Sequence, residues 1–374
     1  MPGRKAGFRF RSKVGLRLCV SDAPDMQRYH RQMLLEGIGE EGQQRLLSSH
    51  ACIVGCGALG CTIADLLARA GVGRLTIVDR DIVEMSNLQR QILFDEQDAS
   101  EGLPKAEAAR RRLCRINSEV QVEALVADVT GPHAERLLFR AATPGVLLDG
   151  TDNFETRYLL NDLSVKRNVP YVYGGVVGTR GMQATFVPGS TGCLRCMFEE
   201  LPDPGAAQTC DTAGVLGPAV NIVAACQASD AIKVLLGRTY LLSRTLLDMD
   251  LWANVRRRLA LVPPRPGCPC CGERRYEFLE DATRGSTANL CGRGAVQVSP
   301  GADGRVDLRA VESRLRPHGS FARLGNLLVR GKLSGERGEL GPLHLTVFAD
   351  GRAIIKGTER PERARTIYAR YIGM

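Results

Sequence analysis

A glycine-rich turn between two apolar runs is the feature that most limits what this chain can fold into. An apolar, strand-like run ends in the pattern Gly55-x-Gly57-x-x-Gly60, and a helix-like segment continues over 58–70. The next apolar run, 74–79, is expected to be a second strand. A strand, a glycine turn and a helix followed by another strand form the βαβ unit that binds nucleotides.

The three glycines have separate expected roles in this turn. Gly55 permits a tight turn, Gly57 lets a phosphate group approach the backbone, and Gly60 lets the helix pack close to the strand. Free N–H groups at the helix N-terminus attract anions. Asp79 lies 19 residues beyond Gly60, near the ~20-residue offset of a carboxylate that binds ribose hydroxyls. These features predict a nucleotide site but do not separate NAD from ATP.

Strand-like and helix-like segments continue to alternate as far as residue 262. Helix signals include the proline at 104, which precedes strong helix formers, and the apolar run that ends at Gly237. Because strands separated by helices form βαβ units, the expected fold class is α/β with a Rossmann-like nucleotide-binding domain. The further strands are expected at 120–126, 145–149, 171–173, 183–187, 244–249 and 255–262.

The positive charge of the chain is concentrated at its N-terminus. The 374 residues have a net charge of +9, and six cations without an acid lie within the first 17 residues. Because a tail explains most of the excess, direct binding of nucleic acid is not expected. The tail has neither the apolar core nor the cleavage site of a secretory signal. Residues 1–25 are therefore expected to be a disordered basic leader.

One later segment, 218–237, is apolar and about long enough to span a bilayer. It includes Asn221, Gln227, Asp230 and Lys233. Burial of such side chains in lipid is costly, so the segment is expected to be a core helix and no membrane association is expected.

Polar side chains follow the expected strands at the edge where α/β sheets bind ligands. The segment 85–91 follows the second strand, and Asp152 follows a later one. Asp152 can cap the next helix, or it can hold Mg²⁺ between phosphates. Lys105 lies at a helix N-terminus, where a cation is unfavourable unless an anion shares the site. We therefore expect Lys105 to contact a phosphate.

Two Cys-x-x-Cys pairs have the spacing of a structural zinc site. They are Cys193 with Cys196 and Cys268 with Cys271, and 71 residues separate the pairs. Thirteen cysteines in a chain without an export signal indicate metal binding or catalysis in a reducing cytoplasm rather than disulfides. The expected zinc ion would join distant segments of one domain, with Cys270 not expected to be a ligand. The alternative is a set of incidental buried cysteines.

Together these motifs resemble the adenylyltransferases that activate ubiquitin-like sulfur carriers, the MoeB/ThiF family, which are relatives of ubiquitin-activating enzymes. The similarity covers residues 26–272, about two thirds of the chain. It rests on both cysteine pairs and on the segments 28–32, 55–60, 79–81, 86–91, 104–105, 151–153 and 209–216. The resemblance implies a mixed sheet in the nucleotide-binding domain.

The resemblance also implies a role for each candidate residue around the nucleotide. Asp79 would bind the ribose of ATP. Asn87, Arg90 and Lys105 would contact the phosphates, while Asp152 would hold Mg²⁺. The implied reaction is attack by a carrier's C-terminal glycine carboxylate on the α-phosphate of MgATP, which gives an acyl adenylate and pyrophosphate. Such chemistry needs mainly positioning and charge neutralisation.

Two further residues have implied roles that involve a second protein. Arg31 would reach the polyphosphate from the neighbouring subunit of a homodimer. Cys210 would form a thioester or an acyl disulfide with the carrier, and the alternative is a surface thiol without a function. The implied partners are a small ubiquitin-like carrier ending in Gly-Gly and a sulfurtransferase or cysteine desulfurase.

The resemblance ends at about residue 272, and the chain beyond residue 280 has its own pattern. Helices are expected at 308–315 and 361–371, and strands at 327–329, 343–348 and 353–356. This pattern predicts a small α+β domain over 281–374, of unknown role, after an adenylyltransferase domain over 26–280.

Several other functions are compatible with parts of the pattern. An NAD-dependent oxidoreductase would use the same glycines and Asp79, although Arg90, Lys105 and Asp152 have no role in hydride transfer. A zinc-containing scaffold would bind a ubiquitin-like protein without activating it. A tRNA-modifying dehydratase of the same superfamily is a third alternative. The sequence does not decide which carrier is used, nor whether it serves molybdopterin, thiamin, cysteine or tRNA thiolation.

Overall fold

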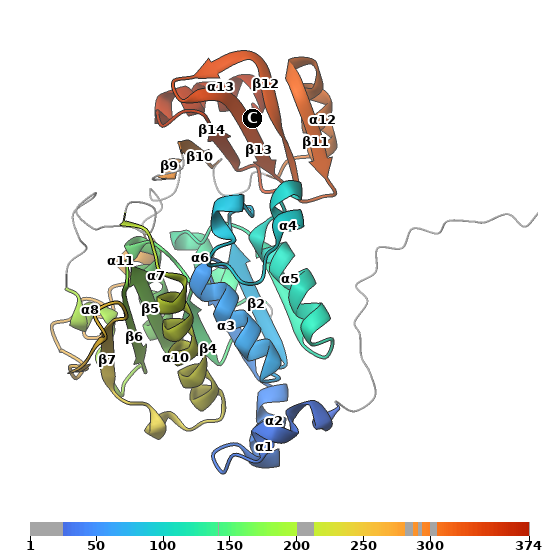
Figure 1. The fold of residues 1–374 in the computed structure, drawn as a ribbon. Helices are drawn as coiled ribbons and strands as arrows, with labels where there is room; N and C mark the ends of the chain where they lie inside the picture. Colours follow the sequence, from blue (N-terminus) through green and yellow to red (C-terminus); the bar gives the residue numbers. More distant parts are fainter. Residues whose placement is uncertain are drawn as a thin grey trace, which may run out of the picture.

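The computed structural model describes residues 25–140, 142–199, 213–280, 287–290, 294–299 and 305–373. Two sheets organise these residues, an eight-stranded sheet and then a six-stranded sheet (Figure 1). Most of the expected leader, together with Cys210, lies outside the described residues. No helix within the described ranges has the length and apolarity needed to cross a membrane.

The eight-stranded sheet has the order β3-β2-β1-β4-β5-β6-β7-β8. Neighbours from β3 to β5 are parallel, and those from β5 to β8 are antiparallel, which confirms the expected mixed α/β sheet. The strands are β1 His50–Val54, β2 Arg74–Asp79, β3 Gln121–Val126, β4 Val146–Asp149, β5 Tyr171–Val177, β6 Arg180–Phe186, β7 Thr245–Asp250 and β8 Val255–Ala260.

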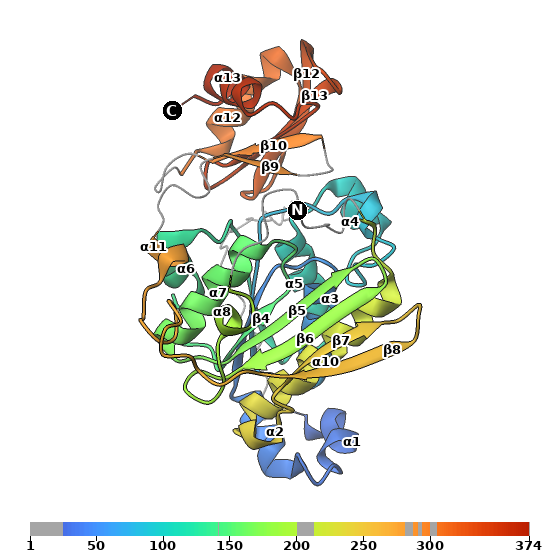
Figure 2. The same cartoon turned by 90° about the vertical axis from the view of Figure 1, so that its left-hand side faces the viewer.

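Helices cover both faces of this sheet, which explains why β1, β2 and β4 are apolar along almost their whole length. On one face α3 (Ala58–Arg69), α5 (Lys105–Ile116) and α10 (Gly217–Leu235) share one hydrophobic core (Figure 1). On the other face α6 (Gly131–Leu138) and α7 (Phe154–Arg167) share a second core (Figure 2). The helix at 218–237 is therefore a core helix, as predicted.

The arm before β1 consists of short pieces rather than one helix. These are η1 (Met26–Tyr29), α1 (His30–Met33) and α2 (Gly39–Leu47). The chain turns between α1 and α2 at Gly39, whose φ of 63° lies in the left-handed region. The other short elements are η2 Met85–Asn87, α4 Glu96–Glu101, α8 Leu194–Met197, η3 Thr239–Leu241 and α11 Glu277–Glu280.

The C-terminal unit, defined here as the described residues from 287 onward, contains an antiparallel sheet of order β11-β12-β13-β14-β10-β9. Its helices α12 and α13 pack on one face of this sheet (Figure 1). The elements are β9 Thr287–Leu290, β10 Ala295–Val298, α12 Leu308–Leu315, η4 Arg316–His318, β11 Gly319–Leu324, β12 Leu328–Gly338, β13 Gly341–Phe348, β14 Ala353–Lys356 and α13 Pro361–Tyr371. The expected α+β architecture is confirmed, although β9, β10 and β11 were not predicted.

Candidate functional site

The order of the parallel strands reverses between β1 and β4, so their carboxyl ends border the crevice where such folds bind ligands. Gly55 follows β1 and has a φ of 88°. A Cβ atom on Gly55 would lie 2.5 Å from the carbonyl oxygen of Gly150, which follows β4. Gly55 is therefore required by both the backbone conformation and the close approach of these two turns.

The other two glycines of the motif have different surroundings. A Cβ atom on Gly60 would lie 1.9 Å from the carbonyl oxygen of Gly55, so the packing of α3 against the turn requires a glycine. A Cβ atom on Gly57 would meet no atom closer than 3.8 Å. The protein itself therefore leaves open space in front of Gly57, at the N-terminus of α3, where a phosphate is expected. The buried Oε1 atom of Gln91 lacks a hydrogen-bond partner among the described residues, and this residue borders the same space.

Asp79 connects the end of β2 to the glycine turn. One carboxylate oxygen accepts a 2.6 Å hydrogen bond from the backbone N–H of Cys56, and the other accepts one of 2.7 Å from the N–H of Asp81. Burial raises the pKa of Asp79, and the nearby Lys105 cation opposes this effect. These two hydrogen bonds hold the Asp79 side chain between the end of β2 and the glycine turn.

Lys105, the first residue of α5, forms an ion pair with Asp81 at 3.1 Å. The Lys105 side chain is 3% exposed and that of Asp81 is 13% exposed. The carboxylate offsets the unfavourable position of a cation at a helix N-terminus. Asp81 belongs to the 79–81 motif, but its role as the partner of Lys105 was not predicted.

The segment after β2 holds two of the other expected phosphate contacts. The Asn87 side-chain oxygen accepts a hydrogen bond from the N–H of Glu84 at 3.1 Å, which leaves the Nδ2 donor for a ligand. Arg90 Nη1 donates to the carbonyl oxygen of Ser86 at 2.9 Å. Arg90 also lies beside Gly217, because a Cβ atom on that glycine would be 4.0 Å from Arg90 Cβ.

Asp152 lies in the turn between β4 and α7, and it is exposed. Asn153, rather than Asp152, caps α7 by accepting a 2.8 Å hydrogen bond from the N–H of Thr156. No hydrogen bond or ion pair to another described residue holds the Asp152 carboxylate, although Arg80 and Arg157 are close enough to interact with it electrostatically. An exposed carboxylate with free oxygens fits a Mg²⁺ ligand.

A buried pair beneath this turn was not identified from the sequence. Asp149 is fully buried and lies 3.4 Å from Arg157. It also accepts hydrogen bonds from Tyr171 and from the N–H and hydroxyl groups of Thr151. Arg157 in turn donates to the Thr151 carbonyl oxygen at 3.1 Å. These contacts fix the backbone that carries Asp152, and the only sequence signal was an acid at the end of an apolar strand.

Arg31 does not join the other candidate residues within this subunit. It lies in α1, and the next residue, Gln32, donates to the carbonyl oxygen of Ala70, just past the end of α3. Gly57 lies at the opposite end of α3, whose 12 residues span about 18 Å. Arg31 is exposed, and α1, which carries it, lies at the lower end of the view in Figure 1.

The two cysteine pairs meet in one cluster. The sulfur atoms of Cys193, Cys196, Cys268 and Cys271 all lie within 4.8 Å of one another. Three of the sulfur–sulfur separations are 3.4, 3.7 and 4.0 Å, which fit the ~3.8 Å edge of a tetrahedron of sulfurs around zinc. The residues present therefore fit a structural zinc ion, which would join the α8 segment to the segment after β8.

Helix α7 contacts this cluster through the buried side chain of Asn161. Asn161 accepts a 2.8 Å hydrogen bond from the N–H of Leu194, and its amide donates to Cys270 Sγ at 3.2 Å. Cys270 is buried and lies between the two ligands of its pair. One helix thus connects the cysteine cluster to the turn that carries Asp152.

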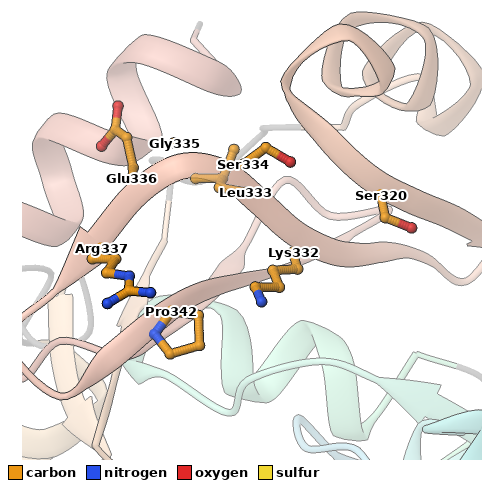
Figure 3. Close-up of a pocket in the computed structure, with 8 residues that line it drawn as sticks. All are labelled: Ser320, Lys332, Leu333, Ser334, Gly335, Glu336, Arg337 and Pro342. Atoms are coloured by element: carbon orange, nitrogen blue, oxygen red, sulfur yellow. The ribbon is translucent and has the colours of Figure 1, made fainter.

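A separate cavity of about 510 Å³ lies on the C-terminal unit (Figure 3). Ser320, Lys332 and Arg337 lie on its wall, on β11 and β12. None of the expected nucleotide or metal residues lines it. The cavity is therefore not the site at the carboxyl ends of the parallel strands.

The ThiF family model matches residues 29–270, which include the glycine turn, the crevice residues and three of the four clustered cysteines, Cys193, Cys196 and Cys268. The chain belongs to the ThiF family. The chain is 42% identical over 347 residues to the sulfur carrier protein ThiS adenylyltransferase of Bacillus subtilis, an alignment that covers 92% of this chain and 99% of that protein. It is 40% identical over 262 residues to the SAMP-activating enzyme E1 of Haloferax volcanii, covering 70% of this chain and 94% of that one.

A solved structure of E. coli MccB with MccA has the same fold over part of this ThiF-family chain. The TM-score is 0.57 at 24% identity, and the match covers 67% of this chain and 75% of MccB. The similarity to the Bacillus protein extends further, because an alignment over 92% of this chain includes most of the C-terminal unit.

Proposed function

We propose that this protein is an ATP-dependent adenylyltransferase that activates the C-terminal carboxylate of a small ubiquitin-like sulfur carrier. The observation that carries the proposal is the alignment along nearly the whole length of a protein named as a ThiS adenylyltransferase. The geometry of the crevice supports ATP as the nucleotide, since Asp79, Lys105 and Asp152 border it together. An NAD-dependent oxidoreductase would leave Lys105 and Asp152 without a role.

In this proposal separate crevice residues bind the phosphates, the ribose and the metal ion. The N–H groups around Gly57 and the side chains of Asn87, Arg90 and Lys105 bind the phosphates. Asp79 binds the ribose, and Asp152 would hold Mg²⁺, which would supply positive charge next to the pyrophosphate leaving group. The carrier carboxylate is already ionised, so the reaction needs no general base.

We also propose that the enzyme works as a homodimer in which Arg31 acts on the neighbouring subunit's nucleotide. Two observations support this. Arg31 is separated from its own crevice by the length of α3. Leu34 and Leu35 on the same arm are 65% and 57% exposed, as expected for side chains that a second subunit covers.

The cysteines support two further parts of the proposal. All ten described cysteines are free, as expected for a protein of the reducing cytoplasm that binds zinc through thiolates. Cys210 lies outside the described residues, and we propose that it forms a covalent link to the carrier after adenylation. A sulfurtransferase or cysteine desulfurase would then supply the sulfur.

The adenylation step is tested by ATP–pyrophosphate exchange with purified ThiS as the carrier. We expect exchange that depends on ThiS and that disappears when ThiS lacks its terminal glycine. Asp152→Ala should lower the rate by about two orders of magnitude or more, because positioning of the metal is lost. Wild-type protein that binds NAD but not ATP would refute the proposed function.

The covalent step is tested separately with Cys210→Ala. This variant should keep pyrophosphate exchange near the wild-type rate, because the adenylate forms without the thiol. Intact-mass spectrometry should show a reductant-sensitive adduct of enzyme and ThiS in the wild type only. If the wild type forms no adduct, Cys210 has no covalent role and the enzyme is an adenylyltransferase alone.

A further inference from the structure

The C-terminal unit contacts the nucleotide-binding sheet through a buried arginine. Arg352, between β13 and β14, is 4% exposed. Its Nη1 atom donates to the carbonyl oxygen of Arg80 at 3.3 Å, and its Nη2 atom donates to the carbonyl oxygen of Val126 at 3.4 Å. Arg80 directly follows β2, and Val126 is the last residue of β3. One guanidinium therefore links the carboxyl ends of two neighbouring strands.

The two carbonyl groups lie on either side of the expected ribose-binding acid. Asp79 pairs with Val126 in the register of β2 and β3, and Arg80 is the next residue after Asp79. The N–H of Ala127 donates to the carbonyl oxygen of Asp79 at 3.2 Å. Any change in the separation of these strand ends would therefore move the Asp79 carboxylate relative to the glycine turn.

A second contact ties the C-terminal unit to the charged residues of the crevice. Gln297 of β10 is fully buried, and its amide donates to Asp128 at 2.6 Å. Asp128 forms an ion pair with Arg80 at 3.3 Å, and Arg80 Nε is 3.9 Å from Asp81. Asp81 holds Lys105. The network thus runs from β10 to the expected phosphate-binding lysine.

The hydrogen bonds of the Arg352 guanidinium are more specific than would be needed only to attach the C-terminal unit to the large domain. Arg352 Nε donates to the Asp350 carboxylate at 2.7 Å, and Nη1 donates to Gln297 Oε1 at 3.4 Å. The guanidinium carbon lies 4.5 Å from the centre of the Phe348 ring. Burial of a charged group is costly unless its donors are satisfied, and apolar side chains could join two surfaces without that cost. The planar fork of donors matches two carbonyl groups at a fixed spacing.

Two relatives align with different shares of this chain. The Haloferax protein aligns over 94% of its own length with 70% of this chain, so little of it remains for a counterpart of the C-terminal unit. The alignment with the Bacillus protein covers 92% of this chain. Relatives of this chain therefore differ in whether their length leaves room for this unit.

We propose that Arg352 is a positioning residue for the nucleotide site: it clamps the ends of β2 and β3 so that Asp79 is held ready for the ribose of ATP. This inference rests on the proposed use of ATP. Arg352 itself does not touch the substrate. Arg352 restricts the motion of Asp79 and of the end of β3 before ATP binds. Less conformational entropy is then lost on binding, so the affinity for ATP increases while the bond-forming step is unchanged.

The test compares Arg352→Met with Arg360→Met, a control on the same unit whose side chain is 71% exposed. Isothermal titration with ATP, without any carrier, should show about tenfold weaker binding for Arg352→Met and no change for the control. In ThiS-dependent exchange, Arg352→Met should raise KM for ATP by a similar factor and leave kcat and KM for ThiS near wild type.

A second variant keeps the test decisive if Arg352→Met folds poorly. Arg352→Lys retains the charge but cannot donate to both carbonyl groups in the same way, so it should remain folded and show an intermediate loss of ATP affinity. Thermal unfolding reports a structural role separately. Variants with lowered melting temperatures but wild-type affinity for ATP would overturn the inference and leave the adenylyltransferase proposal intact. Wild-type protein that binds no ATP would instead overturn the proposed function on which the inference rests.

Discussion

Lys105 Nζ lies 3.1 Å from the Asp81 carboxylate, and both side chains are largely buried. The lysine at the start of α5 therefore has a protein partner before any phosphate arrives. A buried ion pair is costly to break from one side, because the remaining charge is left without compensation. The pair thus links the stability of the domain to the charge that the site presents to a nucleotide.

This relationship predicts different results for two cationic residues of the crevice. Lys105→Met should lower both pyrophosphate exchange and stability, with a loss of about 3 kcal/mol in unfolding free energy, because Asp81 remains buried. Arg90→Met should lower exchange with little loss of stability, since Arg90 contacts a backbone carbonyl at the surface. Chemical denaturation and exchange assays on both variants measure the two effects. Equal stability of the two variants would show that the ion pair contributes little to folding.

The position of Arg31 predicts complementation between subunits. Homodimers of Arg31→Ala and of Asp152→Ala should both be nearly inactive. A mixed dimer should recover activity at one of its two sites, because one site then has both Asp152 and an Arg31 from the partner. Activity is measured after co-expression with two different affinity tags. No recovery in purified mixed dimers would mean that Arg31 acts within its own subunit or not at all.

The cysteine cluster predicts about one zinc ion per chain, measured by plasma emission spectrometry. Cys196→Ser should lose the metal and a substantial part of the thermal stability, because metal binding and folding are coupled. Cys226→Ser is the matched control, since Cys226 is a half-buried thiol outside the cluster. A fully stable metal-free wild type would exclude a structural metal here.

His50 at the start of β1 predicts an acid-sensitive contribution to stability. Burial, assisted by the Arg74 cation, lowers the pKa of His50 from 6.5 to about 4. The folded state therefore favours the neutral ring, and the unfolded state takes up a proton first as the pH falls. The contribution is fully present above pH ~6.5 and declines between pH ~6.5 and ~4.

His50→Gln tests this, because glutamine can replace the 2.9 Å hydrogen bond to Thr76 but does not titrate. The variant should show a smaller fall in unfolding free energy over this pH interval, measured by denaturant titration at several pH values. Pyrophosphate exchange should be unchanged at neutral pH, since His50 lies at the amino end of β1. An unchanged pH profile would assign the acid sensitivity to other groups.

Local patterns were sufficient to predict most of the large domain. The glycine turn, α3 and β2 lie within one residue of their expected positions, because each is specified by neighbouring residues: glycines in the turn and apolar runs on both sides. Short elements with weaker periodicity, such as α6 and the strands β9 to β11, were missed. Of these three strands, β10 pairs with β14, which is distant in the sequence, whereas β9 and β11 pair with the strands next to them in the chain.

The residues of the candidate site could be predicted where one residue type has a characteristic chemical role. Gly55, Asp79, Lys105 and the four cysteines were named from motif and spacing. The structure has Gly55 after β1, Asp79 at the end of β2, Lys105 at the start of α5 and the four cysteines in one cluster, while their roles stay predictions. Asp149 and Gln297 were not named, because a buried polar residue is recognisable only once its partners are known. Cys210 stays a prediction, since it lies outside the described residues.

The sequence by itself determined the family, the nucleotide crevice and the two halves of the cysteine cluster, because these depend on local turns and short spacings. Only the tertiary structure decided how these parts are coupled. The ion pair of Lys105 with Asp81, the support of the cysteine cluster by Asn161, and the contact of Arg352 with two strand ends all join segments far apart in the chain. Such contacts arise from packing of whole elements, so no local pattern of residues encodes them.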